Sequence, residues 1–163
     1  MAVVILVGLL LLTWSPDSFQ KPSKIKSRSE APAFKKEGVL SFFSKTGDNK
    51  IVTIDLEIAD NDFERARGMM YRKNMDASTG MLFIMEREEY QSFWMRNTYV
   101  SLDILFLDKT FSIVHIEKYT QPLSDGSIPS EKRAKYVLEV KAGFCDRHGI
   151  NTGDSIRYSR LNE

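Results

Sequence analysis

The chain has 163 residues, of which 42% are hydrophobic, and this length suits one folded domain with a core of ordinary size. Residues 1–36 hold six Lys and Arg against two Asp and Glu, whereas residues 37–163 hold seventeen against twenty. The first part therefore carries a net charge of +4 and the remainder −3. A mildly acidic domain lacks the basic surface that a phosphate backbone requires, so we expect no nucleic-acid partner.

Residues 2–14 form an uncharged apolar segment that includes four consecutive leucines. As a helix it would be roughly 20 Å long, less than the roughly 30 Å of hydrocarbon in a bilayer, which favours a signal-like export segment over a full span. Basic residues follow the segment and none precedes it, which favours an anchor that holds the domain in the cytoplasm. We expect residues 1–14 to bind a membrane and the domain to be exported, as to a periplasm, with the cytoplasmic orientation as the alternative.

Residues 15–36 contain three prolines, five serines and a basic cluster, with little apolar content. This composition is typical of a disordered tether, which would span about 25 Å on average. We expect a basic tether over residues 15–36 and a single β-rich domain over residues 37–163.

The domain begins with strand patterns. Apolar and polar residues alternate from Ile51 to Ala59, as in a half-buried strand. A second apolar run extends from Val39 to Phe43, and residues 46–49, which lie between the two runs, suit a hairpin turn. The two strands should therefore be antiparallel. Further short runs lie at Gly80–Met85, Ser92–Met95, Leu102–Leu107, Phe111–Glu117 and Tyr136–Val140. Many short strands with polar turns predict a compact antiparallel β sandwich or barrel.

Two short helical segments complete the predicted fold. Asn61 has the spacing of an N-cap to Glu64, so we expect a helix from Asn61 to Met70. Gly143 to His148 suits one helical turn closed by Gly149, with a last strand after residue 154. Residues 120–134 form a long polar segment, which is typical of a connection and less often of a lid.

The densest group of chemically distinctive residues runs from Phe93 to Thr98. In a strand, Trp94 and Arg96 would share one face, and an aromatic surface beside a cation suits a sugar ring or an anionic group. The alternative is a half-buried Trp94 on which Arg96 stacks by cation–π attraction.

Asp103 lies in an apolar strand, where an ionised carboxylate needs a cation or several hydrogen bonds. We expect its partner to be an arginine, and Arg67, Arg72 and Arg96 are the candidates. Such an ion pair would serve either the stability of the fold or a function, and the sequence favours neither alternative.

Cys145 is the sole cysteine, so an intramolecular disulfide and a cluster of thiolate ligands are excluded. Cys145 and His148 share a short predicted turn but lack the third group that orients a nucleophilic pair. The two histidines have no ligand at short spacing, whereas zinc needs three or four converging ligands. We expect no metal and no cofactor, and we expect the numerous methionines to fill the core.

These motifs, with Gly80 to Phe83, Tyr136 to Gly143 and Gly153-Asp154, resemble the prokaryotic family called domain of unknown function 192. The resemblance runs from about Ile51 to about Tyr158. It implies a compact β sandwich or barrel with a small helical element, and members often carry export signals. It implies no activity. The family pattern Arg-Gly-hydrophobic-Met-x-Arg maps onto Arg67, Gly68, Met70 and Arg72, and Trp-Met-basic-Asn-Thr maps onto Trp94 to Thr98. Ser101 stands where the family usually has proline, while Asp103 is retained.

The preferred hypothesis is non-enzymatic binding of a small polar or anionic ligand, with a glycan as one candidate. An acid–base enzyme that uses Asp103 with Arg67 or Arg96 is one alternative, and a protein-interaction module is another. We expect a monomer whose partners are a membrane, through the N-terminal segment, and an unknown small ligand. The candidate ligand-binding residues are Arg67, Met70, Arg72, Trp94, Arg96, Asn97 and Asp103.

Overall fold

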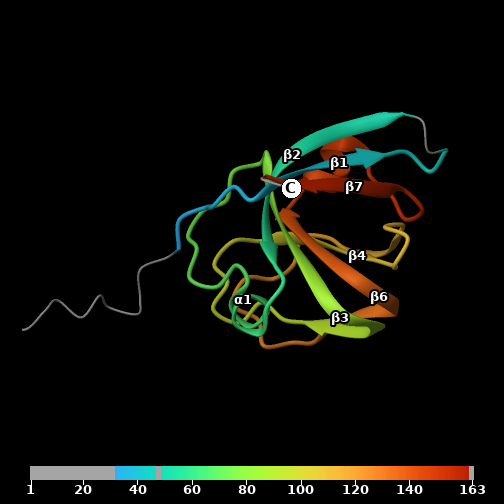
Figure 1. Cartoon of the computed structure of the whole chain (residues 1–163). Helices are drawn as coiled ribbons and strands as arrows, with labels where there is room; N and C mark the ends of the chain where they lie inside the picture. The colour runs from blue at the N-terminus through green and yellow to red at the C-terminus, as the bar shows by residue number, and fades with distance from the viewer. Residues whose placement is uncertain (1–31, 47–48, 162–163) are drawn as a thin grey trace, which may run out of the picture.

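The computed structural model describes residues 32–46 and 49–161 (Figure 1). The expected membrane segment, residues 1–14, and all but the last five residues of the expected tether lie outside the described residues. The described part is mainly β with two short helices, as the sequence predicts. Its elements are β1 (Gly38–Phe43), β2 (Lys50–Ala59), α1 (Asp62–Arg67), β3 (Thr79–Phe93), β4 (Leu102–Leu107), β5 (Ile113–Glu117), β6 (Ile128–Lys141), α2 (Phe144–His148) and β7 (Ser155–Arg160).

The strands form one curled sheet in the order β5-β4-β6-β3-β2-β1-β7. The expected β1–β2 hairpin is antiparallel, and the β2–β3 pair alone among the described strand pairs is parallel, with α1 in the connection between them. The sheet curls until its two outer strands meet at a bridge between Ser112 and Ser155. Ile113 N–H donates to the Asp154 carbonyl at 2.8 Å beside this bridge. Figure 1 shows the resulting half-barrel, with α1 beside it at the lower left.

Both faces of the central strands are covered, so all six residues of β4 are buried. The concave face holds one apolar cluster, which contains Leu105, Leu138 and Phe144. The other face holds a second cluster beneath the loops that follow α1 and β3, which contains Phe83 and Phe106. The methionines buried in this second cluster are Met69, Met75, Met81 and Met95, which confirms for these four the expected role as core fillers.

Strands β3 and β6 are longer than their apolar runs. The sequence pattern suggests separate runs at Gly80–Met85 and Ser92–Met95, but β3 continues from residue 79 to residue 93. The second half of the expected connection at residues 120–134 is likewise replaced by strand, since β6 begins at Ile128. The two strands pair across an irregular register, and Arg133 donates to the Glu88 carbonyl at 2.7 Å. Backbone pairing with a long neighbour thus overrides the polar composition of this ribbon.

Helix α1 has the predicted start but an earlier end. The Asn61 side chain accepts a hydrogen bond from the Glu64 N–H at 3.0 Å, as an N-cap does. The helix ends at Arg67, three residues before the expected Met70, because Gly68 leaves helical geometry at φ 46° and ψ −134°. The chain after Gly68 is thereby turned across the second apolar cluster, where the candidate site lies.

Candidate functional site

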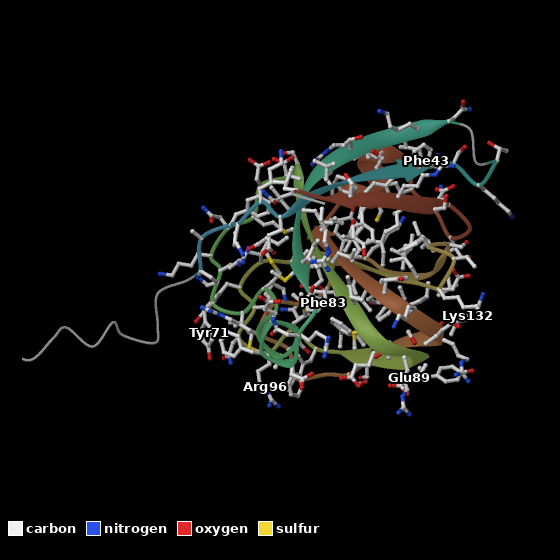
Figure 2. All side chains as sticks on the ribbon, in the orientation of Figure 1. Phe43, Tyr71, Phe83, Glu89, Arg96 and Lys132 are labelled. Carbon is white, nitrogen blue, oxygen red and sulfur yellow. The ribbon has the colours of Figure 1, made fainter. Side chains whose placement is uncertain are left out.

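The segment that follows α1 and the loop that follows β3 lie side by side. Tyr71 N–H donates to the Asn97 carbonyl at 2.8 Å, and the Asn97 side-chain amide donates to the Tyr71 hydroxyl at 3.1 Å. Figure 2 shows Tyr71 and Arg96 at the same end of the domain. The fold therefore joins the two sequence motifs that are well separated in the chain.

Arg72 forms a buried ion pair behind this junction. Its guanidinium makes a two-pronged contact with Glu57, in which Nη2 lies 2.9 Å from Oε1 and Nη1 donates to Oε2. This fork geometry is strong, and the two charges cancel. Arg72 Nε is also buried but has no hydrogen-bond partner within the described residues.

Glu139 lies on β6 near this pair, and it is only 5% exposed. Its Oε2 atom has no hydrogen-bond partner in the part of the chain that the structure describes. Burial raises the pKa of Glu139 to about 8, and the positive charge of Arg72 opposes this rise only in part. The carboxyl group is therefore mostly protonated at neutral pH. A buried polar group without a partner typically costs about 1–3 kcal/mol, so this group calls for an explanation.

A small pocket of about 30 Å³ lies against Glu139. We call it the Glu139 pocket, and its walls include Arg67, Gly68, Met70, Trp94, Thr98 and Glu139. Gly68 keeps it open: a Cβ added there would lie 3.0 Å from the Phe83 ring and 3.9 Å from Glu139 Oε2. Since Gly68 also has a positive φ of 46°, a larger residue at this position would be strained.

Two wider clefts flank the same segment. One has a volume of about 220 Å³ and is lined by Glu57, Arg67 and Arg72 among others. The other, of about 760 Å³, is lined in part by Arg72, Lys73 and Lys141. The segment from Arg67 to Arg72 thus stands between three hollows, with the buried Glu57–Arg72 pair at its base.

Arg67 is the cation at the mouth of the Glu139 pocket. Its guanidinium lies 5.9 Å from the centre of the Phe63 ring, and it forms no ion pair with any described residue. It lines both the Glu139 pocket and the 220 Å³ cleft. Within residues 32–46 and 49–161, the positive charge of Arg67 is thus not neutralised by an ion pair.

The structure brings only part of the sequence-predicted site together. Arg67, Met70 and Trp94 line the Glu139 pocket, whereas Arg72 lies behind it. Arg96 stacks on Trp94 with its guanidinium carbon 4.1 Å from the ring centre and forms an ion pair with Asp125 at 2.6 Å. The cation–π alternative is therefore the arrangement present, although Trp94 remains 45% exposed.

Asp103 has a different environment from the one expected. It is fully buried, and its carboxylate accepts backbone N–H groups from Tyr119 at 3.0 Å, Gly143 at 3.2 Å and Cys145 at 3.0 Å. The expectation of an arginine partner is wrong, because these three backbone donors satisfy the carboxylate. Asp103 lines none of the three hollows described above.

Cys145 does not have the environment of a nucleophile. It is buried, and both burial and the nearby Asp103 raise the pKa of its thiol. The thiol therefore stays protonated. Over residues 32–46 and 49–161, no group of three or more His, Cys, Asp or Glu is arranged to hold a metal ion. In the same ranges, no helix has the length and apolar character needed to cross a bilayer.

Glu57 and Glu139 are site residues that the sequence pattern did not single out. Glu139 stands in the apolar run Tyr136–Val140 in the same way that Asp103 stands in its own strand. The rule that drew attention to Asp103, an acid in an apolar strand, would have found Glu139 as well.

Comparison with known proteins identifies the family of the chain. The family model DUF192, described as "Uncharacterized ACR", matches residues 43–158. A curated relative, a UPF0127 protein of Thermococcus sibiricus strain DSM 12597 / MM 739, is 29% identical over 107 residues, which cover 66% of this chain and 68% of the relative.

Two crystal structures share the fold. A protein described as a "putative transcription regulator" from Sinorhizobium meliloti 1021 has a TM-score of 0.72 and 30% identity, over 78% of this chain and 98% of that one. A protein of unknown function from Novosphingobium aromaticivorans DSM 12444 has a TM-score of 0.68 and 28% identity, over 73% and 83% of the two chains. Because the family model spans most of the sequence, the chain belongs to the domain of unknown function 192 family.

Proposed function

We propose that this protein is a non-enzymatic binding module for a small polar ligand, and that the Glu139 pocket is its binding site. The observation that carries the proposal is the buried Glu139 Oε2 atom, which faces a pocket and has no partner among the described residues. A ligand group that hydrogen-bonds to this carboxyl would remove the cost of leaving it unpaired.

The size of the pocket limits what enters it. A volume of about 30 Å³ holds one small polar group, since one water needs about 10–15 Å³ on the same measure. The rest of a ligand would lie outside, against the exposed part of Trp94 and near Arg67. An aromatic surface beside a cation suits a polar or anionic molecule of modest size.

Several features favour binding over catalysis. Asp103, the proposed base of the enzyme alternative, is held by three backbone donors on the opposite sheet face from Glu139. Cys145 is buried with a raised thiol pKa, and neither histidine lines the Glu139 pocket. The pocket thus offers hydrogen-bonding groups and a cation, with no activated nucleophile.

A ligand screen by thermal unfolding tests the proposal. A ligand present at a hundredfold excess over its dissociation constant stabilises the fold by about 2.7 kcal/mol. We expect responders among small polar molecules, and we expect Glu139→Leu and Trp94→Ala to lose the response. Glu89→Gln, on an exposed part of β3, is the matched control and should keep it. A broad screen without responders, or a response that Glu139→Leu retains, would contradict the proposal.

We also propose that the module works at a membrane, because residues 1–14 are apolar and a basic segment follows them. Cell fractionation of the full chain should place it with membranes, and deletion of residues 2–14 should release it. Protease added to spheroplasts should degrade an exported domain and spare a cytoplasmic one. Recovery of the full chain in the soluble fraction would contradict membrane association.

A further inference from the structure

We infer that the ligand presents an anionic oxygen, as in a carboxylate or a sulfate-like group, to the carboxyl O–H of Glu139 and to the guanidinium of Arg67. This inference rests on the proposed function and specifies its ligand class. It follows from the charges around the Glu139 pocket and from the hydrogen-bonding capacity of its buried groups.

The charges that surround Glu139 leave one cation uncompensated. On α1, Arg65 is paired with Asp62, while Arg67 has no ion pair within the described residues. Glu64, the other acid of α1, accepts a hydrogen bond from the Asp60 N–H at 3.4 Å and lines the 220 Å³ cleft but not the Glu139 pocket. Arg72, in the segment after α1, is paired with Glu57 of β2. The strand neighbours that lie opposite Glu139 are uncharged, being Met81 on β3 and Ile104 on β4. Among the residues that line the Glu139 pocket itself, the unpaired charge is therefore the positive charge of Arg67.

The hydrogen-bonding groups favour an acceptor as the ligand group. A protonated carboxyl group is a donor, and an O–H that meets an anionic oxygen forms a short, charge-assisted hydrogen bond. A cationic ligand would instead need an ionised Glu139 and would be repelled by Arg67.

This arrangement makes binding depend on pH in a defined direction. Glu139, with its pKa raised by burial to about 8, donates its proton below that pH and carries a negative charge above it. Affinity for an anion should therefore be constant at lower pH and fall by up to about tenfold per unit above pH 8. The opposite trend is expected for a cation.

The experiment uses the full chain and probes that do not titrate between pH 6 and pH 9. Acetate and sulfate serve as anions, glycerol as a neutral acceptor and donor, and methylammonium as a cation, each titrated by NMR chemical shifts. We expect acetate or sulfate to bind at the Glu139 pocket, more weakly at pH 9 than at pH 7. Glu139→Gln keeps an uncharged donor and should bind with no loss at pH 9.

Arg67→Gln should weaken anion binding without changing the response to glycerol. Arg157→Gln is its matched control, because Arg157 also stacks on an aromatic ring, Phe43, on β1. Binding of glycerol or methylammonium without binding of the anions would overturn the inference and leave the proposed function standing. If no probe shifts the Glu139 pocket and the wider ligand screen also has no responder, both the inference and the proposed function fail.

Discussion

Asp103 and Glu139 are acidic residues on neighbouring strands, buried to nearly the same extent, with 0% and 5% exposure. In the β4–β6 register Asp103 lies opposite Val140 and Ile104 lies opposite Glu139, so the two acids point to opposite faces of the sheet. Asp103 accepts three backbone N–H groups, whereas Glu139 Oε2 has no partner in the described residues.

The comparison separates burial from function. The fold itself satisfies Asp103, which ties residues 119, 143 and 145 together and so holds the start of α2. Glu139 is neutral and faces a pocket, where a ligand group could supply the hydrogen bond that its Oε2 atom lacks. The number of donors around a buried acid therefore says more about its role than its depth does.

The largest expected effect is at Asp103. Asp103→Ala should lower the free energy of unfolding by about 4 kcal/mol, because three backbone N–H groups lose their acceptor at about 1–3 kcal/mol each. Urea unfolding followed by circular dichroism measures the loss. A variant as stable as the wild type would show that Asp103 is not the structural member of the pair.

Arg72 should behave as a structural residue although it adjoins the ligand pocket. Arg72→Met should cost about 3 kcal/mol at pH 7, because Glu57 is left buried without its cation. The double change Glu57→Leu with Arg72→Met should recover most of this loss. If Arg72→Met alone is neutral in urea unfolding, the charge of this pair is not what holds the segment in place.

Glu139 should make stability fall as pH rises. Its pKa is about 8 in the fold against an ordinary 4.5, so the neutral form is favoured by folding. Its contribution is complete below about pH 4.5 and is lost between there and about pH 8, at no more than about 1.4 kcal/mol per pH unit.

Urea unfolding at pH 5, 6, 7 and 8 measures this slope. Glu139→Gln should flatten it, while Glu89→Gln should leave it unchanged. If the slope persists in Glu139→Gln, other groups cause it. Glu139 would then no longer differ from Asp103 as a buried acid that folding keeps neutral.

The smallest expected effect is at Arg96. Arg96→Ala removes an exposed cation–π contact with Trp94 and an exposed ion pair with Asp125, so it should cost only about 0.5 kcal/mol. Trp94 fluorescence, measured in a Trp14→Phe background so that no other tryptophan contributes, should also change, because the Arg96 guanidinium no longer covers the ring. A loss above about 2 kcal/mol would mean that this surface is part of the fold and not free to serve a ligand.

Much of the local structure follows from sequence pattern. Alternation in β2 predicts its buried face, and the Asn61–Glu64 spacing predicts the N-cap that α1 has. Gly149 closes α2 in the left-handed conformation at φ 65°, as its lack of a Cβ allows. These features depend on neighbours within about four residues, so the sequence alone determines them.

The site depends on contacts that no local pattern contains. The donors to Asp103 lie 16, 40 and 42 positions along the chain, and Glu57 meets Arg72 across 15. An arginine is a reasonable partner for Asp103 by charge. The register of β4 with β6 instead directs Asp103 to the sheet face where the backbone N–H groups of residues 119, 143 and 145 lie.

The sequence by itself therefore determined the β-rich class, the helix caps and the two motifs that mark the site. Only the tertiary structure decided which buried acid is satisfied. The reason is that a carboxylate's pKa and its hydrogen bonds are set by groups that approach through space. At Glu139, burial by residues distant in the chain raises the pKa and the charge of Arg72 opposes this rise, while Gly68 leaves open the space beside Oε2.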